Sequence, residues 1–296
     1  MNKSFTLIEI LVVIVVIGII SSFIIIGLSS FSDKANISKL QVFSNSIRNS
    51  LMLNIMAEWK FDDVSGVQTK DNWSNNLTGT LSNFTDTSAG YGDNNSAGWM
   101  SSKNCISGTC LKLDVGQWVS VASAFPGIGN NSFSFEAWGK TDSTGDTNHH
   151  AIIYLSVSGI TNWLGRLDFP YSTSSRALMF VRSSCYRYSA KYINDNKWHH
   201  VIGVFDRSKT TPDIYVDGKL DNGSSSNSEC STVGSIPSGT IWLVYNSLKG
   251  SVDEIRIYNE IVPAFQVKQN YFIGLNNLFL TNSINYLEYK NNLAEL

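Results

Sequence analysis

The chain has 296 residues, of which 43% are hydrophobic and 16% are charged, which is enough for one sizeable domain with an extension or for two modest domains. The formal net charge is −2, and no run of Lys or Arg could follow a phosphate backbone, so nucleic acid is excluded as an expected partner. Beyond about residue 30 the chain is rich in Asn, Ser, Thr, Gly and aromatic residues, a composition typical of extracellular β domains joined by polar turns.

The first predicted element is an apolar helix over residues 5–26, FTLIEILVVIVVIGIISSFIII. No charged residue occurs from residue 10 to residue 32, about 23 positions, which span roughly the 30 Å hydrocarbon core of a membrane. The leader is only MNKS, and no small-x-small cleavage site follows the apolar run, so a retained anchor fits better than a removed signal peptide. Lys3 favours a cytoplasmic N-terminus, with the residues after Ser29 outside the membrane.

The segment KSFTLIEILVVIVVIGII resembles the N-terminus of type IV prepilins and of type II secretion pseudopilins. This resemblance implies that a prepilin peptidase cuts between Ser4 and Phe5, that Phe5 is N-methylated, and that Glu9 becomes the fifth residue of the mature chain. The family nearly always has Gly where this chain has Ser4. The resemblance also implies a single-pass protein of the inner or cytoplasmic membrane, with its N-terminus inside, which enters a cell-surface filament on assembly.

Glu9 is a carboxylate at the start of the apolar run. A bare carboxylate in hydrocarbon is costly, and it becomes tolerable when a cation lies beside it. The new α-ammonium of Phe5 on an adjacent subunit is such a cation, so we interpret Glu9 as the charge that registers this chain against other pilin subunits. The alternative is an unprocessed anchor in which Glu9 lies at the level of the lipid headgroups.

The pattern changes from apolar to amphipathic after residue 30. Apolar residues recur at mostly three- and four-residue steps, as on one stripe of a helix: Phe31, Ala35, Leu40, Phe43, Ile47 and Leu51. We expect a helix over residues 5–56, with its first half in the membrane or filament core and its second half against the head. A kink near Gly27 is the alternative, and it does not alter the expected function.

From Ala57 the periodicity becomes two, and short aromatic or β-branched runs alternate with Asn, Gly and Ser turns. This pattern predicts an antiparallel β-sandwich of jelly-roll type over residues 57–260. Five segments carry a second resemblance: NCISGTCLKLD, SFSFEAWGK, NKWHHVIGVFD, IYVDGKL and GSVDEIRIYN. In this order they resemble the laminin-G-like, concanavalin A-like family of lectin and glucanase folds. Asp217-Gly218 also predicts a tight hairpin turn.

The strand pattern ends after Asn259. Residues 261–296 are predicted to form two short helices that separate near Thr281-Asn282, with Ser283 as the cap of the second helix. The sequence therefore predicts an α+β chain: a leader at residues 1–4, a transmembrane and amphipathic helix at 5–56, a β-sandwich head at 57–260 and a helical tail at 261–296.

Four cysteines fit an oxidising compartment, because an even number in an exported domain usually forms disulfides. A short turn would bring Cys105 and Cys110 opposite each other, and the concanavalin A-like family has a matching pair here. That leaves Cys185 with Cys230, which would close about 45 residues. A zinc site built from all four cysteines is the alternative, although only one close pair exists where such sites usually show two.

The sequence offers little catalytic chemistry. The four histidines form two pairs of neighbours, which point to opposite faces of a strand and make no natural metal chelate: His149-His150 and His199-His200. Glycosidases on related folds carry clustered carboxylates such as E-x-D-x-E, and here Glu136 stands alone. Asp253 and Glu254 would point to opposite sides of an extended strand. We therefore expect a protein that is not an enzyme.

Calcium and glycan binding are the remaining expectations for the head. Many members of the concanavalin A-like family hold a structural Ca²⁺ between an Asp/Asn-rich loop and the last strand, and Asp71 and Asp253 lie at the matching places. The alternative is that these Asp residues only form turns. Tryptophans expected in loops or strand ends would stack on sugar rings: Trp73, Trp99 and Trp163. The alternative is that the tryptophans fill the core and the head is a spacer.

These features predict a structural and binding protein. We expect a pilin-like subunit of a cell-surface filament, which displays a lectin-like head for adhesion or for binding an extracellular glycan or protein. The first alternative is a type II secretion pseudopilin whose head binds cargo or other pseudopilins. The second alternative is a membrane-tethered carbohydrate-active enzyme.

Overall fold

The computed structural model describes residues 54–74, 77–141, 149–156, 165–171, 174–182, 185–227, 230–245 and 248–296. The chain divides into two units, Met1–Leu51 and Met52–Leu296, and the described residues belong to the second unit. Ser4, Phe5 and Glu9, with the rest of the predicted helix up to residue 53, lie outside the described residues. Within the described part of the chain, no helix is both long enough and apolar enough to cross a membrane.

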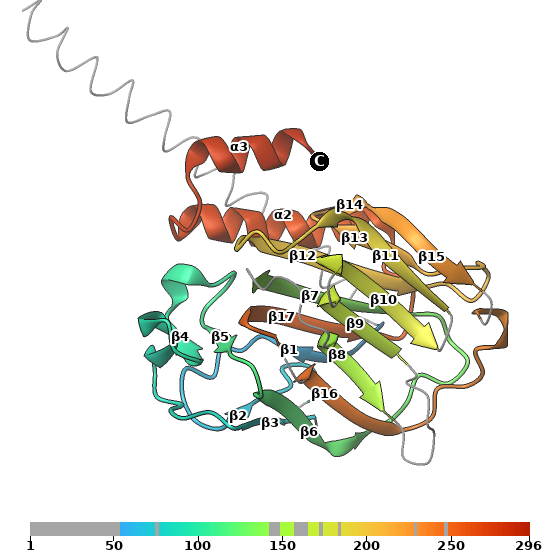
Figure 1. Cartoon of the computed structure of the whole chain (residues 1–296), viewed down its shortest axis with the longest axis horizontal. Helices are drawn as coiled ribbons and strands as arrows, with labels where there is room; N and C mark the ends of the chain where they lie inside the picture. Colours follow the sequence, from blue (N-terminus) through green and yellow to red (C-terminus); the bar gives the residue numbers. More distant parts are fainter. Residues whose placement is uncertain are drawn as a thin grey trace, which may run out of the picture. The chain divides into compact units, whose positions relative to one another are not determined.

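Over the described residues, the strands form two antiparallel sheets that pack as a sandwich (Figure 1). The eight-stranded sheet has the order β14 (Lys219–Leu220), β13 (Asp213–Val216), β12 (Trp198–Phe205), β7 (Phe133–Thr141), β17 (Gly250–Tyr258), β5 (Cys110–Leu113) and β4 (Gly98–Met100), with β1 (Ile55–Trp59) beside β17. The nine-stranded sheet has the order β15 (Asn222–Asn227), β11 (Cys185–Tyr192), β10 (Arg176–Arg182), β9 (Gly165–Tyr171), β8 (His149–Ser156), β16 (Gly239–Tyr245), β6 (Trp118–Phe125), β3 (Gly79–Ser82) and β2 (Gln68–Thr69). Because β1 begins at Ile55, strand structure starts two residues before the predicted boundary at residue 57.

Strands β7 and β12 show why the sequence folds into two layers. Phe133, Phe135 and Ala137 alternate along β7 and lie in the core between the sheets. Val201 and Phe205 of β12 pair with Ala137 and Phe133 and fill the same core. The residues between them point to the outer face, because successive side chains of a strand alternate. The predicted antiparallel β-sandwich is confirmed.

Two C-terminal helices, α2 (Ala264–Leu280) and α3 (Tyr286–Ala294), lie on the side of the eight-stranded sheet that faces away from the core (Figure 1). Val267 of α2 shares an apolar cluster with Ile202 of β12, and Leu275 shares another with Trp138 of β7. A Cβ at Gly274 would lie 2.3 Å from the Trp138 ring, so this close approach of helix to sheet requires glycine. The predicted helical tail therefore packs as an integral layer of the head.

The two helices separate near residues 281–282, as predicted. Asn285 caps α3, because its side chain accepts the N–H of Glu288 at 2.9 Å. The prediction of Ser283 as the cap was wrong, since its hydroxyl instead donates to the carbonyl of Lys103. That bond ties the connection between the helices to the loop before the first disulfide.

Both predicted disulfides are present. Cys105 is bonded to Cys110, and Cys185 at the start of β11 is bonded to Cys230. The zinc alternative was wrong, because every cysteine sulfur is used in a disulfide. The predicted hairpin turn between β13 and β14 is also present, with positive φ at both of its central residues, as a type I′ turn requires.

Candidate functional site

The side of the nine-stranded sheet that faces away from the core carries outward-pointing polar and aromatic side chains. In β9, Leu167 and Phe169 lie in the core, so Arg166 and Asp168, which alternate with them, point outward. Arg166 and Asp168 are both buried although they lie on this outer face. They mark the centre of the candidate site.

Cross-strand pairing extends this centre into a row. Arg166 lies opposite Tyr154 of β8 and Phe180 of β10. Tyr154 lies opposite Trp242 of β16, and Phe180 lies opposite Tyr186 of β11. We call these five residues the outer aromatic row. Strands β8 to β11 follow one another in the sequence, and β16 joins them beside β8 only in the folded sheet.

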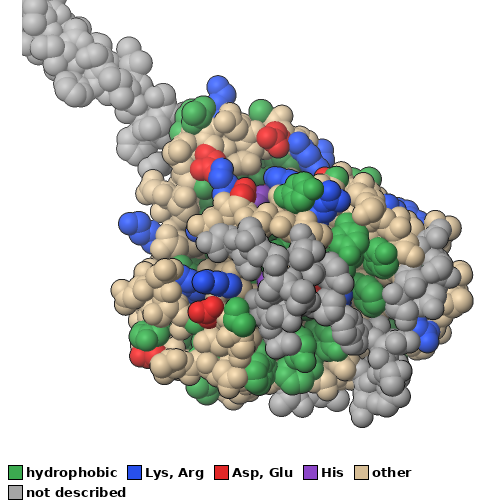
Figure 2. All heavy atoms as spheres, in the orientation of Figure 1, with side chains coloured by type: hydrophobic (Ala, Val, Ile, Leu, Met, Phe, Trp, Pro, Cys, Tyr) green, Lys and Arg blue, Asp and Glu red, His purple; other side chains and the backbone are tan. Residues whose placement is uncertain are grey.

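The rings of the outer aromatic row pack on one another and stay partly exposed. Phe180 stacks on Tyr186 with centroids 6.4 Å apart and planes 6° apart. The guanidinium carbon of Arg166 lies 4.8 Å from the centroid of Phe180. Tyr245, next to the row on β16, stacks on Tyr154 with centroids 5.0 Å apart. Figure 2 shows hydrophobic side chains gathered over strands of this sheet, on the face turned to the viewer.

Arg166 of the row forms a buried ion pair with Asp168, which lies two residues further along β9. Nε of Arg166 donates to Oδ2 of Asp168 at 2.7 Å. Burial raises the pKa of Asp168 to about 6, although the charges of Arg166 and His150 act in the opposite direction. The face thus presents partly exposed rings and phenol hydroxyls around a buried ion pair, and the rings and hydroxyls suit a ligand with both apolar and hydroxyl-bearing sides.

A second polar cluster lies under α2, on the outer face of the eight-stranded sheet. Glu136 is fully buried, with Oε1 2.8 Å from Nε2 of His200 and 3.1 Å from Nη1 of Arg256. Tyr258 and Asn270 donate to its Oε2. Burial alone would raise the pKa of Glu136, but Arg256 and His200 lower it to about 2. Glu136 does not stand alone, and it is an ionised structural carboxylate that fastens α2 to the sheet.

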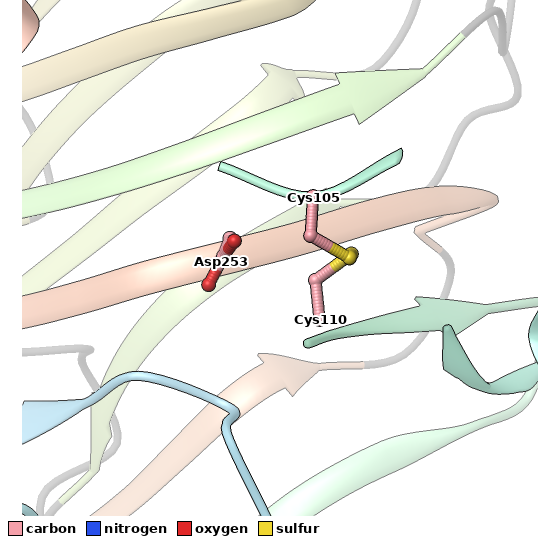
Figure 3. Close-up of side chains that lie close together, drawn as sticks. All are labelled: Cys105, Cys110 and Asp253. Atoms are coloured by element: carbon pink, nitrogen blue, oxygen red, sulfur yellow. A yellow bond between two sulfur atoms is a disulfide. The ribbon is translucent and has the colours of Figure 1, made fainter. Parts of the chain in front are cut away.

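Asp253 lies beside the first disulfide (Figure 3). Potential ligand atoms of Cys105, Cys110 and Asp253 lie within 4.8 Å of one another, but the two sulfurs are bonded to each other and are not available to an ion. Oδ2 of Asp253 accepts the N–H groups of Ile106 at 2.9 Å and of Ser107 at 3.3 Å. This carboxylate therefore holds the loop that the disulfide closes.

Strand β17 is irregular next to Asp253. Glu254 has a positive φ of 50°, and the register with β7 shifts between Asp253 and Arg256. The expectation for an extended strand therefore does not apply: Glu254 pairs with Arg256, and burial and the charge of Glu254 raise the pKa of Asp253. Both carboxylates are buried and hydrogen-bonded, so neither faces an open substrate site.

Asp71, the other predicted calcium ligand, is also buried. Its Oδ1 accepts the N–H of Glu58 at 3.1 Å and of Trp73 at 3.0 Å, and its Oδ2 accepts the N–H and hydroxyl of Ser74. These donors, like those around Asp253, lie where a cation would have to approach the oxygens. The two residues as folded are a poor fit for the ion, and calcium binding stays a prediction.

The three tryptophans predicted to stack on sugars differ in position. Trp99 is fully buried and its Nε1 donates to the carbonyl of Gly66 at 2.7 Å, so the prediction for Trp99 was wrong. Trp73 lies in a turn with 38% of its surface exposed, and Trp163 lies outside the described residues.

The sequence prediction missed the outer aromatic row. Its signal is an aromatic residue at the outward position of a strand, as in AIIYLSV and RALMFVR, where a polar residue is usual.

Several solved structures share the fold of this chain. Domain 4 of AbnA, a GH43 extracellular arabinanase from Geobacillus stearothermophilus solved with arabinotriose, is 19% identical with a TM-score of 0.51, over 73% of this chain and 97% of that domain. Trypanosoma rangeli sialidase in complex with sialic acid is 12% identical with a TM-score of 0.51, over 74% of this chain and 33% of the sialidase. The binding domain of Paraclostridial Mosquitocidal Protein 1 is 12% identical with a TM-score of 0.51, over 74% and 52% of the two chains.

These likenesses concern the fold alone, and this chain spans about a third of the sialidase chains it matches. No curated protein gives a significant match.

Residues 1–25 match the prokaryotic N-terminal methylation motif, which confirms the resemblance of the N-terminus to type IV prepilins. Residues 112–268, more than half of the chain, match the family model for the β-sandwich head. The chain therefore belongs to the concanavalin A-like lectin/glucanases superfamily.

Proposed function

We propose that this chain is a subunit of a type IV pilus-like surface filament whose head binds a glycan without cleaving it. The methylation motif at residues 1–25 supports processing by a prepilin peptidase and assembly with other pilin subunits. The β-sandwich that follows supports a binding head, since its superfamily includes lectins. The filament would carry the head away from the membrane, and the head would bind the glycan.

The observation that carries the glycan proposal is the outer aromatic row. Sugar rings have one apolar face of C–H groups, which packs on flat aromatic rings such as those of Tyr154, Phe180 and Trp242. Their hydroxyls need donors and acceptors, which the tyrosine hydroxyls supply, while the buried Arg166–Asp168 pair lies among the rings. Because the row crosses five adjacent strands at about 4.8 Å per strand, it offers a platform long enough for more than one sugar unit.

Two of the similar structures support this proposal because they were solved with bound carbohydrates. The AbnA domain was solved with arabinotriose, and the sialidase was solved with sialic acid. Their ligands are carbohydrates of different kinds, so they favour a carbohydrate for this head without naming one. The cleavage activity of an arabinanase or a sialidase does not follow, because the match covers one domain of each enzyme.

The arrangement of carboxylates supports binding in preference to hydrolysis. A typical glycoside hydrolase needs two carboxyl groups that flank the scissile bond. Asp168, the carboxylate beside the row on β9, is paired with Arg166. Glu136 lies on the other sheet, where Arg256 holds it ionised under α2.

A glycan array tests the proposal with the full-length chain in a detergent that has no sugar headgroup. We expect the wild type to bind a defined set of glycans and Tyr154→Ala to bind them at least tenfold more weakly, about 1.4 kcal/mol. Tyr286→Ala is the matched control, because Tyr286 is an exposed tyrosine on α3. Equal binding by Tyr154→Ala and Tyr286→Ala would refute the site, and release of free sugar from a bound glycan would refute binding without cleavage.

A further inference from the structure

A cleft of about 650 Å³ lies between the eight-stranded sheet and the C-terminal helices, on the layer opposite the outer aromatic row. Trp138 and Tyr271 line it as a stacked pair, with centroids 5.6 Å apart and planes 16° apart. Leu275 and Leu278 of α2 continue this apolar floor, and all four side chains are buried, so they shape the base of the cleft. The volume falls within the range of about 300–1,000 Å³ that small-molecule sites occupy. The cleft is therefore large enough for a ligand of a few sugar units.

The charges around the cleft compensate one another. Nζ of Lys197 lies 3.2 Å from Oε1 of Glu288 of α3, so this ion pair joins the two sides of the cleft. Nζ of Lys191 lies 2.7 Å from Oδ2 of Asp217. Figure 2 shows Lys or Arg and Asp or Glu side chains close together near the C-terminal helices. An acidic ligand group would compete with Asp217 and Glu288 for the ammonium groups of Lys191 and Lys197, whereas a hydroxyl can accept from an ammonium and donate to a carboxylate while both pairs stay intact.

Uncharged amides complete the wall. Asn196 lies at the turn before β12, and Asn291 lies on the exposed side of α3. Within the described residues neither side chain makes a hydrogen bond to the protein, so each offers an amide donor and a carbonyl acceptor to a ligand. The half-buried ring of Trp198 is held in place, because its Nε1 donates to the carbonyl of Asn104 at 2.9 Å. A fixed indole beside free amides suits the apolar and the hydroxyl-bearing parts of a sugar.

We propose that this cleft is a second ligand site and that it takes a short neutral oligosaccharide. The proposal goes beyond the outer aromatic row, since the two sites lie on different sheets and share no residue. A head with two sites on opposite layers could contact two glycans at once, which raises avidity through the local concentration of the second partner.

Saturation-transfer NMR tests the cleft in the full-length chain, in a detergent without a sugar headgroup. The probes are maltotriose, cellotriose and chitotriose, with trigalacturonic acid as the charged counterpart. A Tyr154→Ala background removes the contribution of the outer aromatic row. We expect at least one neutral trisaccharide to bind this background, and Asn291→Trp, which fills the cleft from an exposed helix position, to weaken that binding at least tenfold.

Lys290→Trp is the matched control, because it adds the same ring at the adjacent exposed position, which does not line the cleft. We expect it to bind as the background does. The inference is overturned if none of the neutral probes binds the Tyr154→Ala background, if Asn291→Trp and Lys290→Trp bind equally well, or if trigalacturonic acid binds more tightly than every neutral probe. Loss of array binding by Tyr154→Ala alone tests the row, so the two proposals fail independently.

Discussion

Glu136 of β7 and Arg256 of β17 face each other across the centre of the eight-stranded sheet, with Oε1 of the glutamate 3.1 Å from Nη1 of the arginine. Arg256 also donates from Nε to Oε1 of Glu58 at 2.6 Å and pairs with Glu254. One buried guanidinium therefore pairs with carboxylates from three strands. The cluster binds the first strand of the head to its last strand, and through Asn270 it binds α2 as well.

The first prediction concerns this guanidinium. Arg256→Met should lower the free energy of unfolding by about 3–5 kcal/mol, because it removes the guanidinium with which the buried carboxylates of Glu58, Glu136 and Glu254 pair. Urea unfolding followed by tryptophan fluorescence measures the change. Lys219→Met is the control, since its ion pair with Glu295 is exposed on both sides and should contribute only about 0–1 kcal/mol. A loss for Arg256→Met no larger than that of the control would contradict the prediction.

The second prediction concerns pH and His199. Nδ1 of His199 lies 2.8 Å from Asp217 and Nε2 lies 3.0 Å from Asp195. Burial alone would lower the pKa of His199, but hydrogen bonds to the two aspartates raise it to about 9. A pKa raised on folding stabilises the protein fully below the unfolded value of about 6.5, and this stabilisation is lost as the pH rises toward 9.

The midpoint of urea unfolding should therefore fall between pH 6.5 and pH 9 in the wild type. His199→Gln should be less stable at pH 6 and should show a smaller fall over the same interval, because it has no proton to lose. Parallel pH profiles for the two proteins would show that His199 is not the group responsible.

The third prediction compares the two disulfides. The Cys185–Cys230 bond links positions 45 residues apart, and the Cys105–Cys110 bond links positions 5 residues apart. The loop-entropy relation gives a stabilisation of about 4 kcal/mol for the long loop and about 2 kcal/mol for the short one. Double Cys→Ser replacement of each pair, followed by thermal and urea unfolding, measures both. An equal loss for the two pairs would contradict the loop-length argument.

The sandwich was predictable from the sequence because each strand carries its own period-two signal. Runs such as SFSFEAWGK alternate core and outer residues, and the structure places Phe133, Phe135 and Ala137 inward as the alternation requires. The helix break and the Cys105–Cys110 bond were predictable from local turns and from a matching pair in the family, and the Cys185–Cys230 bond followed as the pair that remained. The cap of α3 was not, because Asn285 and Ser283 are both good capping residues and tertiary contact with Lys103 decided between them.

The candidate site was not predictable, because it depends on the order of strands. Tyr154 and Trp242 lie far apart in the sequence, and they become neighbours only because β16 inserts beside β8. The polar cluster around Glu136 was missed for a similar reason. The positive φ of Glu254 turns its side chain toward Arg256, whereas an extended strand would point it to the opposite face. Trp99 shows the opposite error, since a short strand within a loop-rich segment placed it in the core.

The fourth prediction concerns processing. If a prepilin peptidase acts as the methylation motif implies, filaments sheared from cells should contain a chain that begins at N-methylated Phe5 and has no free thiol. Intact-mass analysis with and without reduction measures cleavage, methylation and the two disulfides together. Ser4→Gly restores the residue usual in the family and should raise the processed fraction. Surface chains that retain the MNKS leader would contradict the prediction.

The fifth prediction concerns Glu9 and filament assembly. A carboxylate in an apolar environment is tolerated when a cation lies beside it, and the α-ammonium of Phe5 on a neighbouring subunit would be that cation. Glu9→Val should therefore leave export and membrane retention intact, since it only adds apolar character, but it should reduce incorporation into sheared filaments at least tenfold. Thr6→Val is the control, because it replaces an uncharged polar residue in the same segment and should assemble normally. Assembly of Glu9→Val at the wild-type level would show that no ion pair registers the subunits.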